Sequence, residues 1–207
     1  KFEEFIANVE KWSEIRGFTD SDPKVQYLSC VEESVKEISE AKILKNSDML
    51  VDAIGDTAVT LVILEKQLEN ILGGNPNVVN ASIKGNYVEL MYRIGCISAN
   101  LRRENWYNAY QSVYTAMSCL EIFATKEGYD FNECCKIAWN VIKDRNGMMV
   151  NGSYIKEADF TSSQKSEFLA KQNSAKPRGK SRQVPDQWTE VQKLQFAQKQ
   201  GGFSGLS

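Results

Sequence analysis

Apolar residues recur every three to four positions through most of the first 145 residues, the spacing that gathers them on one face of an α-helix. The first stripe predicts a helix over residues 2–12 that ends before the breaker at 17–23. The second predicts a helix over 24–45. Its predicted core positions share one helical stripe and are Leu28, Val31, Val35, Ile38 and Ala41.

Four more helices are predicted beyond this point. Ser47 is the expected N-cap of a third helix, which should end near the turn at 73–76. Because only a short connection separates the second and third helices, they should form an antiparallel pair. The later stripes predict helices over 88–101, 106–126 and 131–144.

The second and fourth predicted helices show a weak internal match. Val35, Ile38, Ser39 and Asn46 have the same spacing as Ile94, Ile97, Ser98 and Asn105. A degenerate duplication explains this match, and so does chance between two amphipathic helices. We take the duplication as a working hypothesis, with repeat one at 1–72 and degenerate repeat two at 78–145.

The last part of the chain differs in pattern from the helices. Residues 148–156 predict a small β-hairpin around Asn151-Gly152, the pair that a type I′ turn favours. From residue 161 to 207 Gln, Ser, Lys and Gly dominate, which predicts a flexible basic tail. Within it, an apolar patch from Trp188 to Phe196 is either a partner-binding helix or scattered apolar residues in an unstructured tail. The basic positions at 176–182 either bind nucleic acid or an acidic protein or form a solubilising linker, and we favour the linker.

The sequence therefore predicts an all-α fold, an antiparallel helical bundle over 1–160 with one hairpin and a C-terminal tail. The hydrophobic share of 42% suits a buried core, and the net charge of -2 argues against holding polyanions by charge alone. Five cysteines in apolar patterns indicate reduced core residues. No stretch is long and apolar enough for a membrane span or a secretion signal, so we expect a cytoplasmic protein.

Two pairs of acids are the main candidates for chemistry, because the chain contains no histidine. Glu33 and Glu37, and Asp52 and Asp56, each lie four residues apart and share a helix face. Four such carboxylates across an antiparallel pair would repel unless Mg²⁺ or Mn²⁺ lay between them. The alternative is that they line a solvated face. Gly55 weakens a helix interior, so something should approach the backbone there.

The segments that carry these acids resemble a known family. They are WSEIR at 12–16, QYLSCVEESVKEISEA at 26–41, VDAIGDTAVTLVIL at 51–64 and IKDRNGMMVNGSYIKEAD at 142–159. They look like the phage-type branch of the MazG-like, all-α nucleoside triphosphate pyrophosphohydrolases. The resemblance covers nearly everything before the tail. It implies that the acids hold Mg²⁺ and that a nucleotide is cleaved between the α- and β-phosphates to a monophosphate and pyrophosphate.

The chain also departs from the family pattern, which has two adjacent glutamates and a third acid three residues on. In one register Glu33 and Glu37 match and Ser34 replaces a glutamate; in the other Glu32 and Glu33 match and Lys36 replaces the third acid. We prefer the first register because it agrees with the internal repeat. In repeat two the acids are replaced by other residues, namely Tyr92, Arg93, Cys96, Gln111 and Thr115. By resemblance, repeat two completes a bundle, and a homodimer or larger assembly is expected.

Four further residues are candidates for binding the nucleotide substrate. Trp12 and Arg16 are placed to stack a base and reach a phosphate, although an aromatic residue at helical spacing is also typical of a core. Lys143 and Arg145 follow the last predicted helix, where cations are favourable in any case.

Two hypotheses follow. The first is a Mg²⁺-dependent pyrophosphohydrolase acting on (d)NTP, encoded by a phage and active in the host cytoplasm. The second is a non-catalytic MazG-like binding or structural subunit, of a phage particle for example, whose tail binds a protein partner. The missing carboxylate and the acid-free second repeat motivate the second hypothesis.

Overall fold

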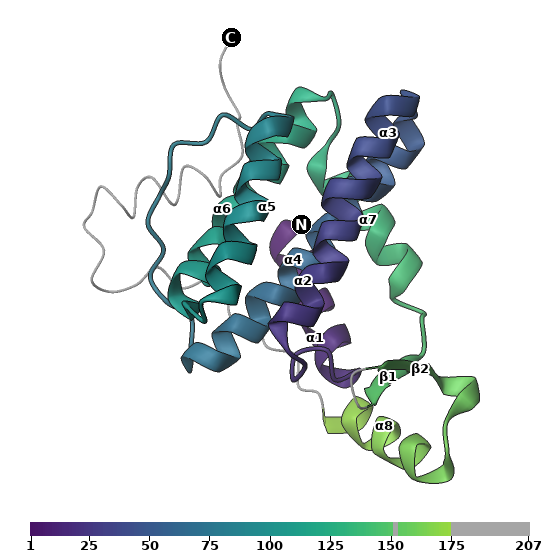
Figure 1. Ribbon diagram of the computed structural model, residues 1–207. Coiled ribbons are helices and arrows are strands. Elements are labelled where there is room, and N and C mark those ends of the chain that lie inside the picture. The colour runs from purple at the N-terminus through teal and green to yellow at the C-terminus, as the bar shows by residue number, and fades with distance from the viewer. Residues whose placement is uncertain (151–152, 175–207) are drawn as a thin grey trace.

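The computed structural model describes residues 1–150 and 153–174, and these form a helical bundle with one small hairpin (Figure 1). In chain order the elements are α1 (Phe2–Ile15), α2 (Pro23–Val31), the π turn η1 (Glu32–Glu37), α3 (Ile38–Leu44), α4 (Ser47–Leu72), α5 (Tyr87–Arg102), α6 (Trp106–Lys126), α7 (Phe131–Ile142), β1 (Gly147–Val150), β2 (Ser153–Lys156), the short turn η2 (Glu157–Asp159) and α8 (Ser162–Ser174). The predicted all-α fold is confirmed.

Helix α4 is the centre of the bundle and packs against α1, α2, α6 and α7. Its side chains are buried around most of its circumference, as expected for a helix with apolar residues on nearly every face. It begins at Asn46, whose side chain accepts hydrogen bonds from the backbone N–H groups of Asp48 and Met49, both at 3.1 Å. The predicted cap, Ser47, was therefore wrong by one residue. Gly73, with φ of 73°, ends the helix as the sequence predicted.

The core face predicted for the second helix is correct at Ile38 and Ala41 and wrong at Leu28 and Val35. Leu28 is 66% exposed and Val35 is 36% exposed, whereas Cys30, Ser34 and Ile38 are fully buried. The buried positions are four apart, and residues at that spacing drift around an α-helix of 3.6 residues per turn. The π turn between α2 and α3 widens one turn to an i→i+5 bond and keeps them on one side. A prediction that assumes 3.6 residues per turn throughout therefore places the core residues on the wrong face before and within the π turn.

The helix pairs α3–α4 and α5–α6 are joined by matching turns. Lys45 and Glu104 both have left-handed φ values, 51° and 55°, and each precedes an asparagine that caps the next helix. The Asn46 N–H donates to the Ala41 carbonyl at 3.0 Å, and the Asn105 N–H donates to the Asn100 carbonyl at 3.0 Å. Two copies of one helix–turn–helix unit would share this geometry, and the duplication itself stays a prediction.

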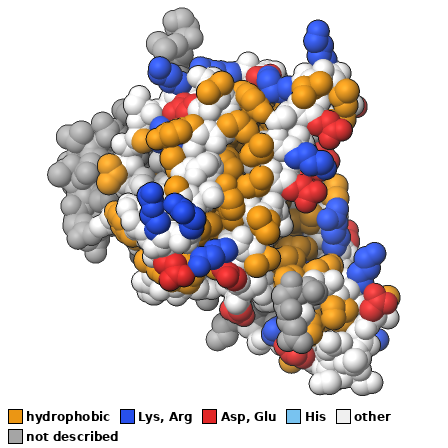
Figure 2. All heavy atoms as spheres, viewed as in Figure 1, with side chains coloured by type: hydrophobic (Ala, Val, Ile, Leu, Met, Phe, Trp, Pro, Cys, Tyr) orange, Lys and Arg blue, Asp and Glu red, His pale blue; other side chains and the backbone are white. Residues whose placement is uncertain are grey.

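The visible face in Figure 2 carries a stripe of hydrophobic side chains. Exposed apolar residues on α2 and η1 include Leu28 and Val35, and those on α5 include Val88 and Tyr92. Figure 1 shows α5 and α2 at the front of the same view. We call this surface of α2, η1 and α5 the apolar face.

The C-terminal part confirms the hairpin and corrects the tail. β1 and β2 pair antiparallel with Met148 opposite Ile155, while the predicted turn residues 151–152 lie outside the described part. Residues 162–174, predicted as flexible tail, instead form α8, which contacts α1. Phe168 anchors this helix at 1% exposure, with the Phe160 ring 5.4 Å away. One apolar anchor in a polar segment gives no periodic signal, so the sequence could not show it.

The remaining tail, including the patch from Trp188 to Phe196 and the basic run at 176–182, lies outside the described residues. Cys30, Cys119, Cys134 and Cys135 are buried, as predicted, whereas Cys96 is only partly buried. Among the described helices, none combines the length and the apolar character needed to cross a membrane.

Candidate metal and phosphate site

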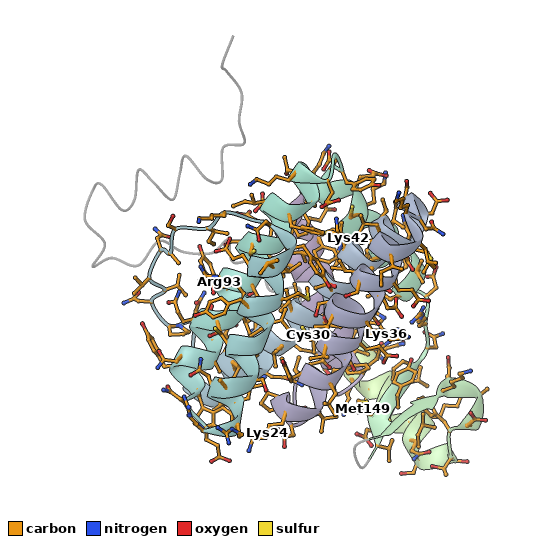
Figure 3. The ribbon with its side chains drawn as sticks, turned by 45° about the horizontal axis from the view of Figure 1, so that its top comes forward. Lys24, Cys30, Lys36, Lys42, Arg93 and Met149 are labelled. Atoms are coloured by element: carbon orange, nitrogen blue, oxygen red, sulfur yellow. The ribbon has the colours of Figure 1, made fainter. Side chains whose placement is uncertain are left out.

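Glu33 and Glu37 lie on the π turn, where the Ile38 N–H donates to the Glu33 carbonyl instead of to a residue four back. Both side chains are half-buried, whereas Glu32 and Lys36 are exposed. Lys36 lies 3.8 Å from carboxylate oxygens of both Glu32 and Glu37, on the opposite side of the helix from Cys30 (Figure 3). The π turn thus directs two carboxylates inward and leaves the lysine in solvent.

Asp52 and Asp56 lie on α4, against which η1 packs. Asp52 is exposed and Asp56 is half-buried. Both lie on one face of the helix, because four residues make slightly more than one turn. The fold therefore places the two predicted acidic pairs on neighbouring elements.

The acids are close enough to perturb one another. Burial, followed by the charges of Asp56 and Glu37, raises the pKa of Glu33 to about 8. Burial and the charge of Asp52 raise the pKa of Asp56 to about 6, while Arg145 opposes that rise. Asp56 therefore ionises first, and its charge then keeps the proton on Glu33.

One oxygen of the site is left unsatisfied. Glu33 Oε2 is buried and has no hydrogen-bond partner. A buried carboxylate oxygen without a donor is costly, and either a proton or a cation would satisfy it. The donor set of four carboxylates is the chemistry that Mg²⁺ or Mn²⁺ prefers. However, within residues 1–150 and 153–174 no three acidic or cysteine side chains converge tightly enough to hold one ion as they stand.

Ser34 lies between the glutamates and is completely buried. Its hydroxyl donates to the Cys30 carbonyl at 2.5 Å. It therefore packs into the core and does not face α4 with the acids. Of the two registers considered, the first is the one in which both matched glutamates, Glu33 and Glu37, are half-buried beside α4.

Gly55 lies between the two aspartates, and another helix approaches it closely. A Cβ at this position would lie 2.4 Å from the Cys134 carbonyl oxygen and 2.8 Å from the Ala138 Cβ. The expected close approach is thus made by α7. Because α7 leads directly into the segment that carries Lys143 and Arg145, this contact also sets the position of that segment relative to Asp56.

Trp12 and Arg16, predicted to meet the nucleotide, are both buried near the end of α1. The Arg16 guanidinium lies 4.6 Å from the Trp12 ring centroid and donates to the Arg145 carbonyl. The Trp12 ring stacks on Phe18 at 5.4 Å, and Phe18 stacks on Tyr154 at 5.7 Å. The prediction that this pair touches substrate has no support in this geometry, because both side chains are enclosed by protein.

Lys143 and Arg145 are both exposed after the end of α7. Lys143 Nζ donates to Asn140 Oδ1 at 2.9 Å. The positive charge of Arg145 acts on Asp56 and lowers the pKa of its carboxyl group. Of the four predicted substrate-binding residues, Arg145 is the one that the structure brings to the acidic site.

Repeat two carries no equivalent cluster at the positions aligned with the acids. The Gln111 side chain pairs with both the N–H and the carbonyl of Val79, each at 2.7 Å. Arg93 donates to the Ser82 carbonyl at 3.3 Å and binds Glu89 at 2.9 Å. The segment between α4 and α5, which carries Val79 and Ser82, therefore occupies this region and is held there by the Gln111 amide and by Arg93.

Comparison with known proteins shows a similarity over part of the chain. No family model matches the chain. The chain is similar to a protein described as an uncharacterized 18.2 kDa protein in the rep-hol intergenic region of Haemophilus phage HP1 (strain HP1c1), with 36% identity over 66 residues. The match spans 31% of this chain and 40% of the phage protein. No solved structure matches. The likeness is thus to part of a phage protein and carries no activity.

Proposed function

We propose that the chain is a Mg²⁺-dependent nucleoside triphosphate pyrophosphohydrolase of the MazG-like type, encoded by a phage. The observation that carries the proposal is the meeting of two acidic pairs on η1 and α4, with the pKa of Glu33 raised to about 8 and its Oε2 atom unsatisfied. Structural carboxylates of an ordinary surface helix are solvated and keep their usual pKa values. A cation-dependent site accounts for the cost of bringing these acids together.

Glu33, Glu37, Asp52 and Asp56 are the residues that would hold the metal, with Mn²⁺ as a substitute for Mg²⁺. When bound, such a cation neutralises phosphate charge and makes a bound water more acidic. Small changes of side-chain rotamer would be needed, since no three of the described acids converge on one point. Glu33 and Glu37 are only half-buried, so a change of side-chain rotamer should cost little there.

The chain's own groups would perform the remaining steps. Arg145, exposed beside Asp56, would pair with the phosphates and orient them. A carboxylate oxygen of Glu33 or Glu37 would accept the proton of the attacking water. Water adds to the α-phosphorus, the bond to the bridging oxygen breaks, and pyrophosphate leaves with the electron pair. The products are a nucleoside monophosphate and pyrophosphate.

The test is pyrophosphate release from a panel of ribo- and deoxyribonucleoside triphosphates, with Mg²⁺ or Mn²⁺. The Asp56→Asn variant should be at least about 100-fold slower, as expected for loss of one charged group at a phosphoryl-transfer site. The Glu40→Gln variant changes an exposed acid of α3 and serves as the matched control. Equal rates in all three proteins would contradict the proposal.

One observation favours a second candidate, a non-catalytic MazG-like subunit that binds a protein partner through its C-terminal tail, in a phage particle for example. Ser34 fills the place of a family glutamate and is fully buried, so the acidic set is one carboxylate short. On this hypothesis Asp56→Ala would leave partner binding intact, and removal of residues 175–207 would abolish it.

The proposed assembly is a homodimer or a larger homo-oligomer. The apolar face supports it, since Leu28 and Val88 are 66% and 75% exposed on neighbouring helices. Sedimentation of the wild-type chain and of Leu28→Lys with Val88→Lys tests this part. A wild-type monomer at micromolar concentration would contradict it.

A further inference from the structure

The Arg16 side chain is 4% exposed, and its donors are directed to backbone oxygens. Nε and Nη2 donate to the Arg145 carbonyl at 2.8 and 2.6 Å, and Nη1 donates to the Trp12 carbonyl at 3.2 Å. The paired N–H donors of an arginine guanidinium more commonly bind a carboxylate or phosphate group. In the described part of the chain Arg16 forms no ion pair, and its buried guanidinium instead binds two backbone carbonyls, those of Trp12 and Arg145.

The rings around Arg16 belong to elements far apart in sequence. Its guanidinium lies 4.6 Å from the Trp12 ring centroid and 5.8 Å from that of Phe168 on α8. The Tyr154 side chain of β2 also hydrogen-bonds with Arg16. Arg16 therefore connects α1, the hairpin and α8 to the segment that follows α7.

The same residue fixes the other end of that segment. The Met149 N–H of β1 donates to the Arg16 carbonyl at 2.6 Å. Residues 145 and 149 are thus both tied to Arg16, one through its side chain and one through its backbone. The stretch between these two anchors contains the start of β1, so Arg16 holds the backbone on both sides of the point where the hairpin begins.

The residue positioned in this way, Arg145, is an exposed cation that acts on α4 of the acidic site, whereas Lys36 pairs with Glu37 on η1. The Arg145 side chain extends from the segment whose carbonyl Arg16 holds, and its charge reaches Asp56. Among the described residues no ion pair holds the Arg145 guanidinium, so the hydrogen bonds from Arg16 to its carbonyl are the contacts that fix this residue in the fold. A shift of this carbonyl would move the guanidinium away from the acids.

We propose that Arg16 is a positioning residue: supported by Phe168 of α8, it fixes the Arg145 backbone so that the Arg145 guanidinium receives the phosphates of a polyphosphate ligand beside the acidic site. This inference rests on the proposed function for its ligand, and it gives α8 a role in the site. Arg16 itself touches no phosphate.

A double-mutant cycle tests whether Arg16 acts through Arg145. Binding of inorganic tripolyphosphate with Mg²⁺ is measured by calorimetry for the full chain and for Arg16→Lys, Arg145→Ala and the double variant. Each single change should weaken binding about 10-fold, and the double variant should bind no more weakly than Arg145→Ala. Additive losses would overturn the inference, because they would mean that Arg16 acts independently of Arg145. Arg102→Lys, an exposed change on α5, is the control.

Hydrogen exchange gives a second readout that needs no ligand. Arg16→Lys and the milder Phe168→Leu should both speed amide exchange at residues 145–150, including Met149, while exchange within α5 and α6 stays as in the wild type. Unchanged exchange at 145–150 in both variants would overturn the inference. If the wild-type chain hydrolyses nucleotides but the cycle is additive, the inference fails alone; if it binds tripolyphosphate with a non-additive cycle but hydrolyses nothing, the proposed function fails alone.

Discussion

The Glu33 carboxyl on the π turn lies within the field of the Asp56 carboxyl on α4, and this charge helps to raise the pKa of Glu33 to about 8. Asp56 has a pKa near 6, so between these values the site holds one ionised and one protonated acid. Near neutral pH the chain therefore carries a proton that a cation would displace. This relationship links a local irregularity of one helix to the charge state of the site.

The metal-free chain should lose stability as the pH rises from about 5 to 9. Glu33 and Asp56 have folded-state pKa values above their unfolded values of about 4.5 and 3.8. In that interval the folded state binds more protons than the unfolded state, so the free energy of unfolding falls with pH. Thermal unfolding at several pH values without divalent cations measures this slope.

The Glu33→Gln variant should have a shallower slope, because a neutral amide replaces the group that titrates last. Its melting temperature should match that of the wild type near pH 5 and exceed it at pH 9. If stability falls with pH as steeply in Glu33→Gln as in the wild type, the result contradicts the raised pKa of Glu33. Glu40→Gln, at an exposed position of α3, should leave the slope as it is.

Mg²⁺ should stabilise the wild-type chain, and more strongly at pH 8 than at pH 5, because metal and proton compete for the same carboxylates. A cation at about 100 times its dissociation constant adds about 2.7 kcal/mol, or several degrees in melting temperature. Asp56→Asn should remove most of this gain. An equal Mg²⁺ effect in Asp56→Asn would show that the cation binds elsewhere.

Gly55→Ala and Gly95→Ala should change stability in opposite directions. The new methyl group at 55 would meet the Cys134 backbone at 2.4 Å and force α4 and α7 apart, at a cost of about 1 to 3 kcal/mol. At 95 nothing lies within 4 Å, so alanine should stabilise α5 by about 1 kcal/mol. Urea unfolding of both variants decides the matter. Two changes of the same sign would be evidence against the described contact between α4 and α7.

Ser34→Glu should fail to restore a more complete acidic set. The side chain is fully buried, so a glutamate there would be an uncompensated charge and should destabilise the fold by more than about 3 kcal/mol. Ser34→Ala should cost about 1 kcal/mol through loss of the bond to the Cys30 carbonyl. A stable Ser34→Glu chain with increased activity would mean that this position faces the acids after all.

Much of the fold follows from local patterns in the sequence. The helix over 106–126 and the hairpin were predicted nearly as observed, because apolar periodicity, breakers and an Asn-Gly pair are local signals. The π turn was not predicted, since a single inserted residue shifts the core face without altering composition. Helix α8 was missed because its buried side chain, Phe168, packs against Arg16, which is more than a hundred positions away in the sequence.

The sequence predicted that the four acids lie on neighbouring elements, and it did not predict the contacts that hold these elements in place. The pairing of the acids followed from their four-residue spacing and a short connection between helices. Arg16 was assigned to the substrate because its side chain type suits phosphate, yet its donors are directed to the Arg145 carbonyl. Long-range backbone contacts of this kind leave no trace in a single sequence. The exposure of Arg145 beside Asp56 likewise depends on how α7 ends.

The most direct test of the central proposal is the pyrophosphate released by purified wild-type chain from nucleoside triphosphates at pH 8 with Mg²⁺, measured beside Asp56→Asn. The account predicts equimolar monophosphate and pyrophosphate from at least one nucleotide, dependent on the cation, and a rate at least about 100-fold lower in Asp56→Asn. Release of no pyrophosphate from any nucleotide with either Mg²⁺ or Mn²⁺ would contradict it.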